Sequence, residues 1–303
     1  MVYVLLAMII FGSTFALNKY VINNGVDPIL FAFLRGVIAC LLILPFYLKE
    51  QNKPRWNRND WLILLFIGCG AAAMAQVLEY SGTVLTTASN VSLIVSTESA
   101  VAILLSVWLL RERMSGYSLI GTIVAFTGLF LILFDDLGSV EFHLGSALVG
   151  DLIVFASVFC WALYTVFSKH ILQRSTPISA LFFVTLFSSL TLGTINLVRG
   201  KYMETLEIQN LSWIAILYLG IFGSGLGHIF YYLALRRLSA SIVSLMLTLL
   251  PVCGIGFSMI LLNERLNLIE SLGALVIMTG VGYAVYPRER KLPASESVCP
   301  ETV

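Results

Sequence analysis

Long apolar runs separated by short polar breaks make up most of the sequence. Ten of these runs are long enough for a transmembrane helix, which takes about 20 residues. The runs are continuous rather than alternating, so we expect helices and not a β-barrel. We therefore predict an all-α integral membrane protein with ten transmembrane helices. The expected spans are residues 2–21, 29–48, 61–81, 89–110, 117–134, 147–168, 178–198, 212–233, 241–262 and 268–286.

The composition excludes the soluble classes of protein. Of the 303 residues, 58% are hydrophobic and 12% are charged, about half the charged share of a soluble domain. Such a chain cannot cover the surface of a soluble enzyme, and a net charge of +1 provides no basic face for nucleic acid. The five cysteines show no CxxC spacing, so we expect neither a metal site nor a cofactor. We place the chain in the cell membrane, with the lipid bilayer as its surroundings.

The distribution of Lys and Arg predicts the orientation of the spans. If the N-terminus is cytoplasmic, the cytoplasmic segments hold 13 of the 18 basic residues and the outer segments hold four. Cytoplasmic loops of membrane proteins are enriched in Lys and Arg. We therefore expect both termini in the cytoplasm, with residues 288–303 as a short disordered tail.

The chain also repeats itself weakly. Similar residues recur about 150 positions apart across eight of the ten expected spans, and the shared offset carries more weight than any single match. We therefore divide the chain into two five-helix units, residues 2–134 and 147–287. The clearest matches are Lys19 with Lys169, Pro28 with Pro177, Trp61 with Trp213, Tyr80 with Tyr232, and Gly121 with Gly273.

An odd number of spans in each unit requires the second unit to be inverted in the membrane. The charges agree with this requirement, because the loop at 49–60 has four basic residues while its counterpart near 199–207 mixes basic and acidic residues. Two inverted repeats are typical of secondary transporters, whose substrate site lies near the bilayer midplane between the repeats.

Several short motifs resemble the drug/metabolite transporter superfamily, in its EamA-type branch. The resemblance covers about residues 2–287 and implies that spans one to four and six to nine surround a central cavity. Spans five and ten would brace this cavity from outside, and the substrates would be amino acids, amines, sugars or other metabolites. One departure is Ser99, which stands where the second unit has Pro251, so only the later helix has the expected proline kink. The motifs are Phe11-Gly12-Ser13-Thr14-Phe15, Phe33-Leu34-Arg35-Gly36, Leu250-Pro251-Val252 and Leu262-Asn263-Glu264-Arg265-Leu266.

Three charged residues lie deep within the expected spans, where a charge costs about 2.5–3.5 kcal/mol near the bilayer centre. Glu98 is about 14 Å into the fourth span at 1.5 Å per residue, and it is a candidate ligand for a substrate ammonium or a proton. The alternative is a protonated side chain that only bonds within the bundle. Arg35 and Glu79 lie at similar depth, so we predict an intramembrane ion pair; otherwise Arg35 extends outward to the interface.

Polar and aromatic residues near the interface between the units complete the candidate site. Positions i, i+3 and i+4 share one helix face, and such a face recurs at equivalent places in both units. His228 could titrate near neutral pH, and aromatic faces could hold an ammonium. The alternative for all of them is hydrogen bonding or packing between helices. The candidate cavity-lining residues are Gln76, Glu79 and Tyr80, their counterparts His228, Tyr231 and Tyr232, and also Asn18, Trp161 and Tyr164.

Together these features favour a secondary active transporter that exports small polar metabolites, such as amino acids or amines, by alternating access. Protons are the expected coupling ion, because no Na⁺ site can be named. Two alternatives remain. An intramembrane enzyme would need a catalytic partner beside Glu98, which the sequence does not suggest. A non-transporting scaffold or receptor would have no aqueous cavity.

Overall fold

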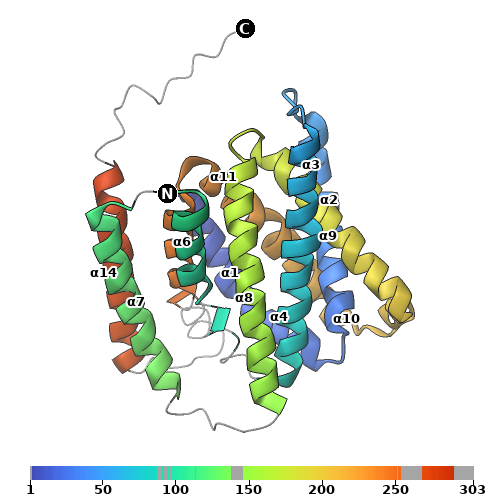
Figure 1. Ribbon diagram of the computed structural model, residues 1–303. Helices are drawn as coiled ribbons and strands as arrows, with labels where there is room; N and C mark the ends of the chain where they lie inside the picture. The colour runs from blue at the N-terminus through green and yellow to red at the C-terminus, as the bar shows by residue number, and fades with distance from the viewer. Residues whose placement is uncertain are drawn as a thin grey trace.

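A computed structural model describes residues 2–86, 91, 94–95, 97–112, 114–137, 146–250, 252–253 and 268–289. These residues form a bundle of helices (Figure 1). Six of the described helical segments are long and apolar enough to cross a membrane, and four shorter apolar helices occupy the remaining expected spans. The prediction of an all-helical membrane protein is confirmed, while the number of ten spans stays a prediction.

The helices of the first half follow the expected spans closely. The third expected span is one continuous helical segment with a π-helical stretch in its middle. The fourth is described only over its second half. The elements are α1 (Val2–Asn23), α2 (Pro28–Lys49), α3 (Arg58–Leu65), η1 (Phe66–Ala72), α4 (Ala73–Leu85), α6 (Glu98–Leu109) and α7 (Gly116–Leu137).

The second half presents a similar order of elements. Its eighth expected span also contains a π-helical stretch, and its ninth is described only over its first half. The last helix continues to Glu289, two residues into the segment 288–303 that we expected as a tail, and the rest of that segment lies outside the described residues. The elements are α8 (Ser146–Ile171), α9 (Pro177–Arg199), η2 (Lys201–Glu207), α10 (Asn210–Tyr218), η3 (Leu219–Gly227), α11 (His228–Arg237), α12 (Ala240–Met246), η4 (Leu247–Leu249) and α14 (Leu268–Glu289).

Local sequence signals set the starts of the two central helices. Asp27 precedes α2, and its carboxylate accepts the backbone N–H groups of Ile29 and Leu30. Thr176 caps α9 in the same way by accepting the N–H of Ser179. A proline occupies the first turn of each helix, where its missing N–H costs nothing. The two helices therefore begin at defined points, which sets the depth of the side chains they carry.

Each of the two π-helical stretches packs closely on a helix of the other half of the chain. A Cβ added at Gly68 of η1 would lie 2.8 Å from the carbonyl oxygen of Val184 on α9. A Cβ added at Gly220 of η3 would lie 2.7 Å from the Cβ of Ile38 on α2. Glycine, which has no Cβ, allows these close contacts, and π-helical turns are frequent at functional sites. Neither stretch was predicted from the sequence.

Helices α7 and α14 pack along each other at one edge of the bundle (Figure 1). Glycines allow this contact, because a Cβ on Gly280 would lie 2.4 Å from the backbone nitrogen of Ala125. This is the position that the resemblance implied for the fifth and tenth spans.

The outer surface of the bundle is apolar. Leu104, Trp108 and Val198 are 69%, 74% and 82% exposed, as suits side chains in contact with lipid. Several polar and charged side chains are instead buried, among them Arg35 and Glu98. This distribution is the reverse of that in a soluble protein, so the candidate site lies among the buried polar side chains.

Candidate functional site

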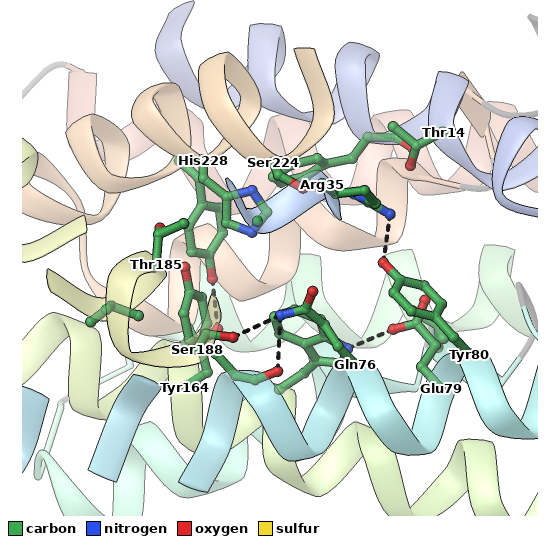
Figure 2. Close-up of a pocket in the computed structure, with 18 of the residues that line it drawn as sticks. Thr14, Arg35, Gln76, Glu79, Tyr80, Tyr164, Thr185, Ser188, Ser224 and His228 are labelled. Atoms are coloured by element: carbon green, nitrogen blue, oxygen red, sulfur yellow. Dashed lines mark hydrogen bonds between the residues drawn. The ribbon is translucent and has the colours of Figure 1, made fainter. Parts of the chain in front are cut away.

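A cavity of about 140 Å³ lies inside the helix bundle. Its wall combines side chains from the first half (α1, α2, η1, α4 and α6) with side chains from the second (α8, α9, η3, α11 and η4). Figure 2 shows Arg35 and Ser224 on one side of the cavity and Gln76, Glu79 and Tyr80 on the other. Nine of the ten candidate residues line it together with Arg35: Asn18, Gln76, Glu79, Tyr80, Glu98, Trp161, Tyr164, His228 and Tyr231.

Arg35 connects α2 to three other helical segments, α1, α4 and η3. Its Nη1 donates hydrogen bonds to Asn18 Oδ1 at 3.0 Å and to the Tyr80 hydroxyl at 2.6 Å. Its Nε donates to Ser224 Oγ at 3.1 Å. The guanidinium carbon also lies 5.3 Å from the centre of the Phe31 ring, within the range of cation–π attraction. These contacts hold a buried cation at a fixed place.

The structure does not contain the expected direct ion pair between Arg35 and Glu79. Glu79 Oε2 instead accepts a hydrogen bond of 2.6 Å from Trp161 Nε1. The reason is geometric: Glu79 and Tyr80 are consecutive residues of α4, so their side chains point about 100° apart, and Tyr80 is the one that meets Arg35. The attraction between Arg35 and Glu79 therefore acts through space without a direct hydrogen bond.

Glu98 is the first residue of α6 and is buried, with 8% of its surface exposed. It lies near Thr165, which shares a 2.6 Å hydrogen bond with the Tyr231 hydroxyl. It also lies close enough to Glu79 for the two carboxyl groups to repel each other. Two buried acidic groups therefore line the same cavity, where they can take up a cation or a proton.

An aromatic cluster covers the cavity beside these acids. The Trp161 and Tyr164 rings meet edge to face with centres 5.4 Å apart, and Phe11 meets His228 at 5.0 Å. His228 Nδ1 lies 3.0 Å from the carbonyl oxygen of Gly223. This hydrogen bond orients the ring towards the cavity that it lines.

Tyr232 is the candidate residue that the structure places outside the cavity lining. Its side chain is fully buried, and its hydroxyl hydrogen bonds to Ser168 Oγ at 2.8 Å. The neighbouring Tyr231 takes the place facing the cavity, because consecutive residues of a helix point in different directions. Tyr232 therefore joins α11 to α8 and supports the wall from behind.

Sequence reasoning missed the hydroxyl groups of α9. Thr185, Ser188 and Ser189 line the cavity, and Ser188 Oγ accepts a 3.1 Å hydrogen bond from Gln76 Nε2. Positions 185, 188 and 189 share one helix face, so the spacing that identified Gln76, Glu79 and Tyr80 could have found them. Isolated hydroxyl groups are common in membrane helices, so without a nearby charge they do not identify a site.

The described part of the chain contains no group of three or more His, Cys, Asp and Glu side chains that could hold a metal ion. The candidate site is therefore a polar, partly charged chamber with an aromatic side. Such a chamber can bind a small hydrated solute by hydrogen bonds and charge.

Comparison with known proteins identifies the family of this chain. The profile of the EamA-like transporter family matches residues 1–134 and 148–286. A Bacillus subtilis protein named "Uncharacterized transporter YyaM" is 25% identical over 271 residues, which cover 89% of this chain and 88% of the relative. An Escherichia coli protein named "Probable amino-acid metabolite efflux pump" is 23% identical and is covered over 93% of both chains.

A solved crystal structure has a similar fold. It superposes with a TM-score of 0.76 and covers 95% of this chain and 97% of its own, at 16% sequence identity. This likeness shows that the arrangement of helices is an established one.

Proposed function

The chain belongs to the EamA-like transporter family, and from this premise we propose that it exports small polar metabolites, such as amino acids or amines, by secondary active transport. It is a membrane transporter of the EamA type and a multi-pass protein of the cell membrane. The observation that carries the proposal is the charged and polar cavity inside a bundle whose outer surface is apolar. A scaffold has no need of such a chamber, and the transporter names of the relatives favour transport over a receptor or an enzyme.

Contacts that recur with the two halves exchanged support an inverted repeat. Gly68 of the first half packs on Phe187 of α9, and its counterpart Gly220 packs on Ile38 of α2, the counterpart of Phe187. Equivalent contacts of this kind are expected when a two-fold axis relates the two halves. With five spans expected in each unit, 2–134 and 147–287, this axis would lie in the membrane plane.

Two lysines support the same repeat. Lys19 Nζ donates to the carbonyl oxygens of Thr83 and Thr86 at the end of α4, at 2.7 and 3.0 Å. Lys169, its counterpart, donates to the carbonyl oxygens of Leu235 and Leu238 at the end of α11, at 2.7 and 2.6 Å. Each lysine therefore joins two helices within its own unit, at equivalent places of the two repeats. Alternating access around the cavity between the repeats completes the proposal.

Proton coupling is part of the proposal, with Glu98 as the carrier and with both termini in the cytoplasm. Glu98 lines the same cavity as a second acid, Glu79, and lies near the Thr165 and Tyr231 hydroxyl groups, which can pass a proton. A carboxyl group in this setting can exchange a proton for a substrate cation, because it cannot hold both at once.

Counterflow in proteoliposomes tests the function. Purified protein is reconstituted and a panel of amino acids, amines and sugars is offered with and without a pH gradient. We expect flux of at least one amino acid or amine that increases when protons are driven against it. Absence of flux for every compound would refute the proposal.

Glu98→Gln tests the proton-carrying residue. We expect the variant to lose the response to the pH gradient, because an amide cannot take up a proton. Glu204→Gln is the matched control, since Glu204 is partly exposed in η2 and pairs with Lys201. If Glu98→Gln and the control respond equally to the gradient, Glu98 has no part in coupling.

A further inference from the structure

Arg35 has no direct ion-pair partner among the residues that the structure describes. The guanidinium is buried, with 6% of the residue exposed, and its hydrogen bonds go to neutral acceptors on Asn18, Tyr80 and Ser224. Charged groups inside a membrane protein are usually paired, and the exceptions mark substrate pathways.

Part of the guanidinium also remains available for a ligand. Nε and Nη1 are engaged, but Nη2 makes no hydrogen bond to any residue that the structure describes. A Cβ added at Gly223 would lie 3.3 Å from Nη2 and 3.1 Å from the methyl group of Thr14. Glycine at position 223 therefore leaves room beside this nitrogen, and Thr14 and Ser224 line the cavity next to it.

The facing wall has the opposite charge. Glu79 and Glu98 line the cavity, and only one oxygen of Glu79 is engaged, by Trp161. Figure 2 shows Arg35 and Glu79 on opposite sides of the space. The cavity thus presents a positive group on one side and Glu79 on the other, and a second acidic group, Glu98, also belongs to its lining.

We propose that Arg35 binds the carboxylate of the transported solute, which is a zwitterionic amino acid with its ammonium towards Glu98. This inference rests on the proposed transport function and narrows it, because a simple amine would leave Arg35 without a direct ion-pair partner. The planar guanidinium matches a carboxylate in shape as well as charge. A phosphate ester would also suit the guanidinium, but its second negative charge would face Glu79 and Glu98.

The size of the cavity agrees with a small amino acid. An engineered cavity of about 150 Å³ accommodates benzene, and this cavity measures about 140 Å³. The side chain of the solute would lie against the Trp161 and Tyr164 rings, which are aligned edge to face.

Binding measurements on matched ligands test the anchor. Ligand-dependent thermal stabilisation of the purified full chain is measured with an amino acid that the protein transports, with its decarboxylated amine, and with O-phosphoethanolamine. A hydrogen bond to a charged group typically contributes enough for about tenfold in affinity. We therefore expect the wild-type protein to bind the amino acid at least tenfold more tightly than the amine.

Arg35→Gln should abolish this preference, so that amino acid and amine bind with similar affinity. Arg35→Lys keeps the charge but loses the planar donors, and it should retain only part of the preference. Arg199→Gln is the matched control, because Arg199 pairs with Asp27 outside the cavity; it should keep the full preference. Amine binding by the Arg35 variants also verifies that they are folded.

Three results would overturn the anchor: equal wild-type affinity for amino acid and amine, a preference that survives in Arg35→Gln, or tightest binding of O-phosphoethanolamine. Equal wild-type affinities would overturn the anchor even if the Arg35 variants do not fold. If amino acids are transported but the preference does not depend on Arg35, the anchor fails while the transport function stands. If no amino acid or amine is transported, both fail together.

Discussion

Glu112 should stabilise the fold from one half of the chain to the other. It lies between α6 and α7, and its Oε1 accepts the N–H of Ala240 at 2.8 Å. Its Oε2 accepts the N–H of Ser241 at 3.0 Å and the Ser241 hydroxyl at 2.7 Å. The carboxylate thus caps the first turn of α12, where the helix dipole favours a negative charge.

The magnitude follows from these three bonds. A hydrogen bond to a charged group contributes about 1.5–3 kcal/mol. Glu112→Gln keeps one acceptor but places an amide donor against one of the donors on α12. Glu112 is only partly buried, so water recovers part of the loss, and we expect the free energy of unfolding to fall by about 2 kcal/mol. This corresponds to a lower melting temperature on the order of 5 °C.

Thermal unfolding of the purified protein in detergent measures this shift, and half-lives at a fixed temperature replace it if unfolding is irreversible. Glu204→Gln is the control, since its partner Lys201 is partly exposed and the pair contributes little. The KM for transport should not change, because Glu112 does not line the cavity. A melting temperature of Glu112→Gln equal to that of the control would refute the capping role. Glu264, its counterpart in the repeat, lies outside the described residues.

Two further predictions concern the ends and the edge of the bundle. Burial alone would raise the pKa of Asp27, but hydrogen bonds from Arg199 and from the N–H groups of Leu30 and Ile29 hold that pKa below its ordinary value. The ionised carboxylate of Asp27 therefore stabilises the fold above the unfolded pKa of about 3.9. This stabilisation is lost as the pH falls through the lower pKa of the folded state. Asp27→Asn, which still caps α2, should cost roughly 1 kcal/mol at pH 7 and almost nothing well below about pH 4; an equal cost at both pH values would contradict this. Gly280→Ala should separate α7 from α14 and cost about 1–3 kcal/mol without changing the KM, because the added Cβ would meet backbone atoms of Ala125 and Gly121 at 2.4 and 2.8 Å. Gly282→Ala is its control, since a Cβ there meets nothing within 4 Å, and equal melting temperatures of the two variants would contradict the prediction.

The membrane class and the candidate residues were accessible from the sequence because their signals are local. A run of about 20 apolar residues predicts a span wherever it occurs, and a charge such as Glu98 stands out within it. The i, i+3, i+4 spacing placed Gln76, Glu79 and Tyr80 on one face, and the structure does place all three at the cavity.

The second half shows the limit of the same rule. The spacing treated Tyr231 and Tyr232 alike, but only Tyr231 reaches the cavity. A few tens of degrees of helix rotation decide which neighbour faces inward, and this rotation is set by packing against other helices. The π-helical stretch η3 just before α11 also changes the directions in which the following side chains point. No pattern in the sequence predicted this stretch.

The sequence by itself determined that this chain crosses a membrane, where most of its helices lie and which polar side chains they carry into the bilayer. The tertiary structure decided which of these side chains meet. Arg35 contacts Asn18, Tyr80 and Ser224 instead of Glu79, and the hydroxyls of α9 join the cavity wall. Partners separated by up to 189 positions depend on the rotation and depth of several helices at once. That information resides in their mutual packing and not in any one segment.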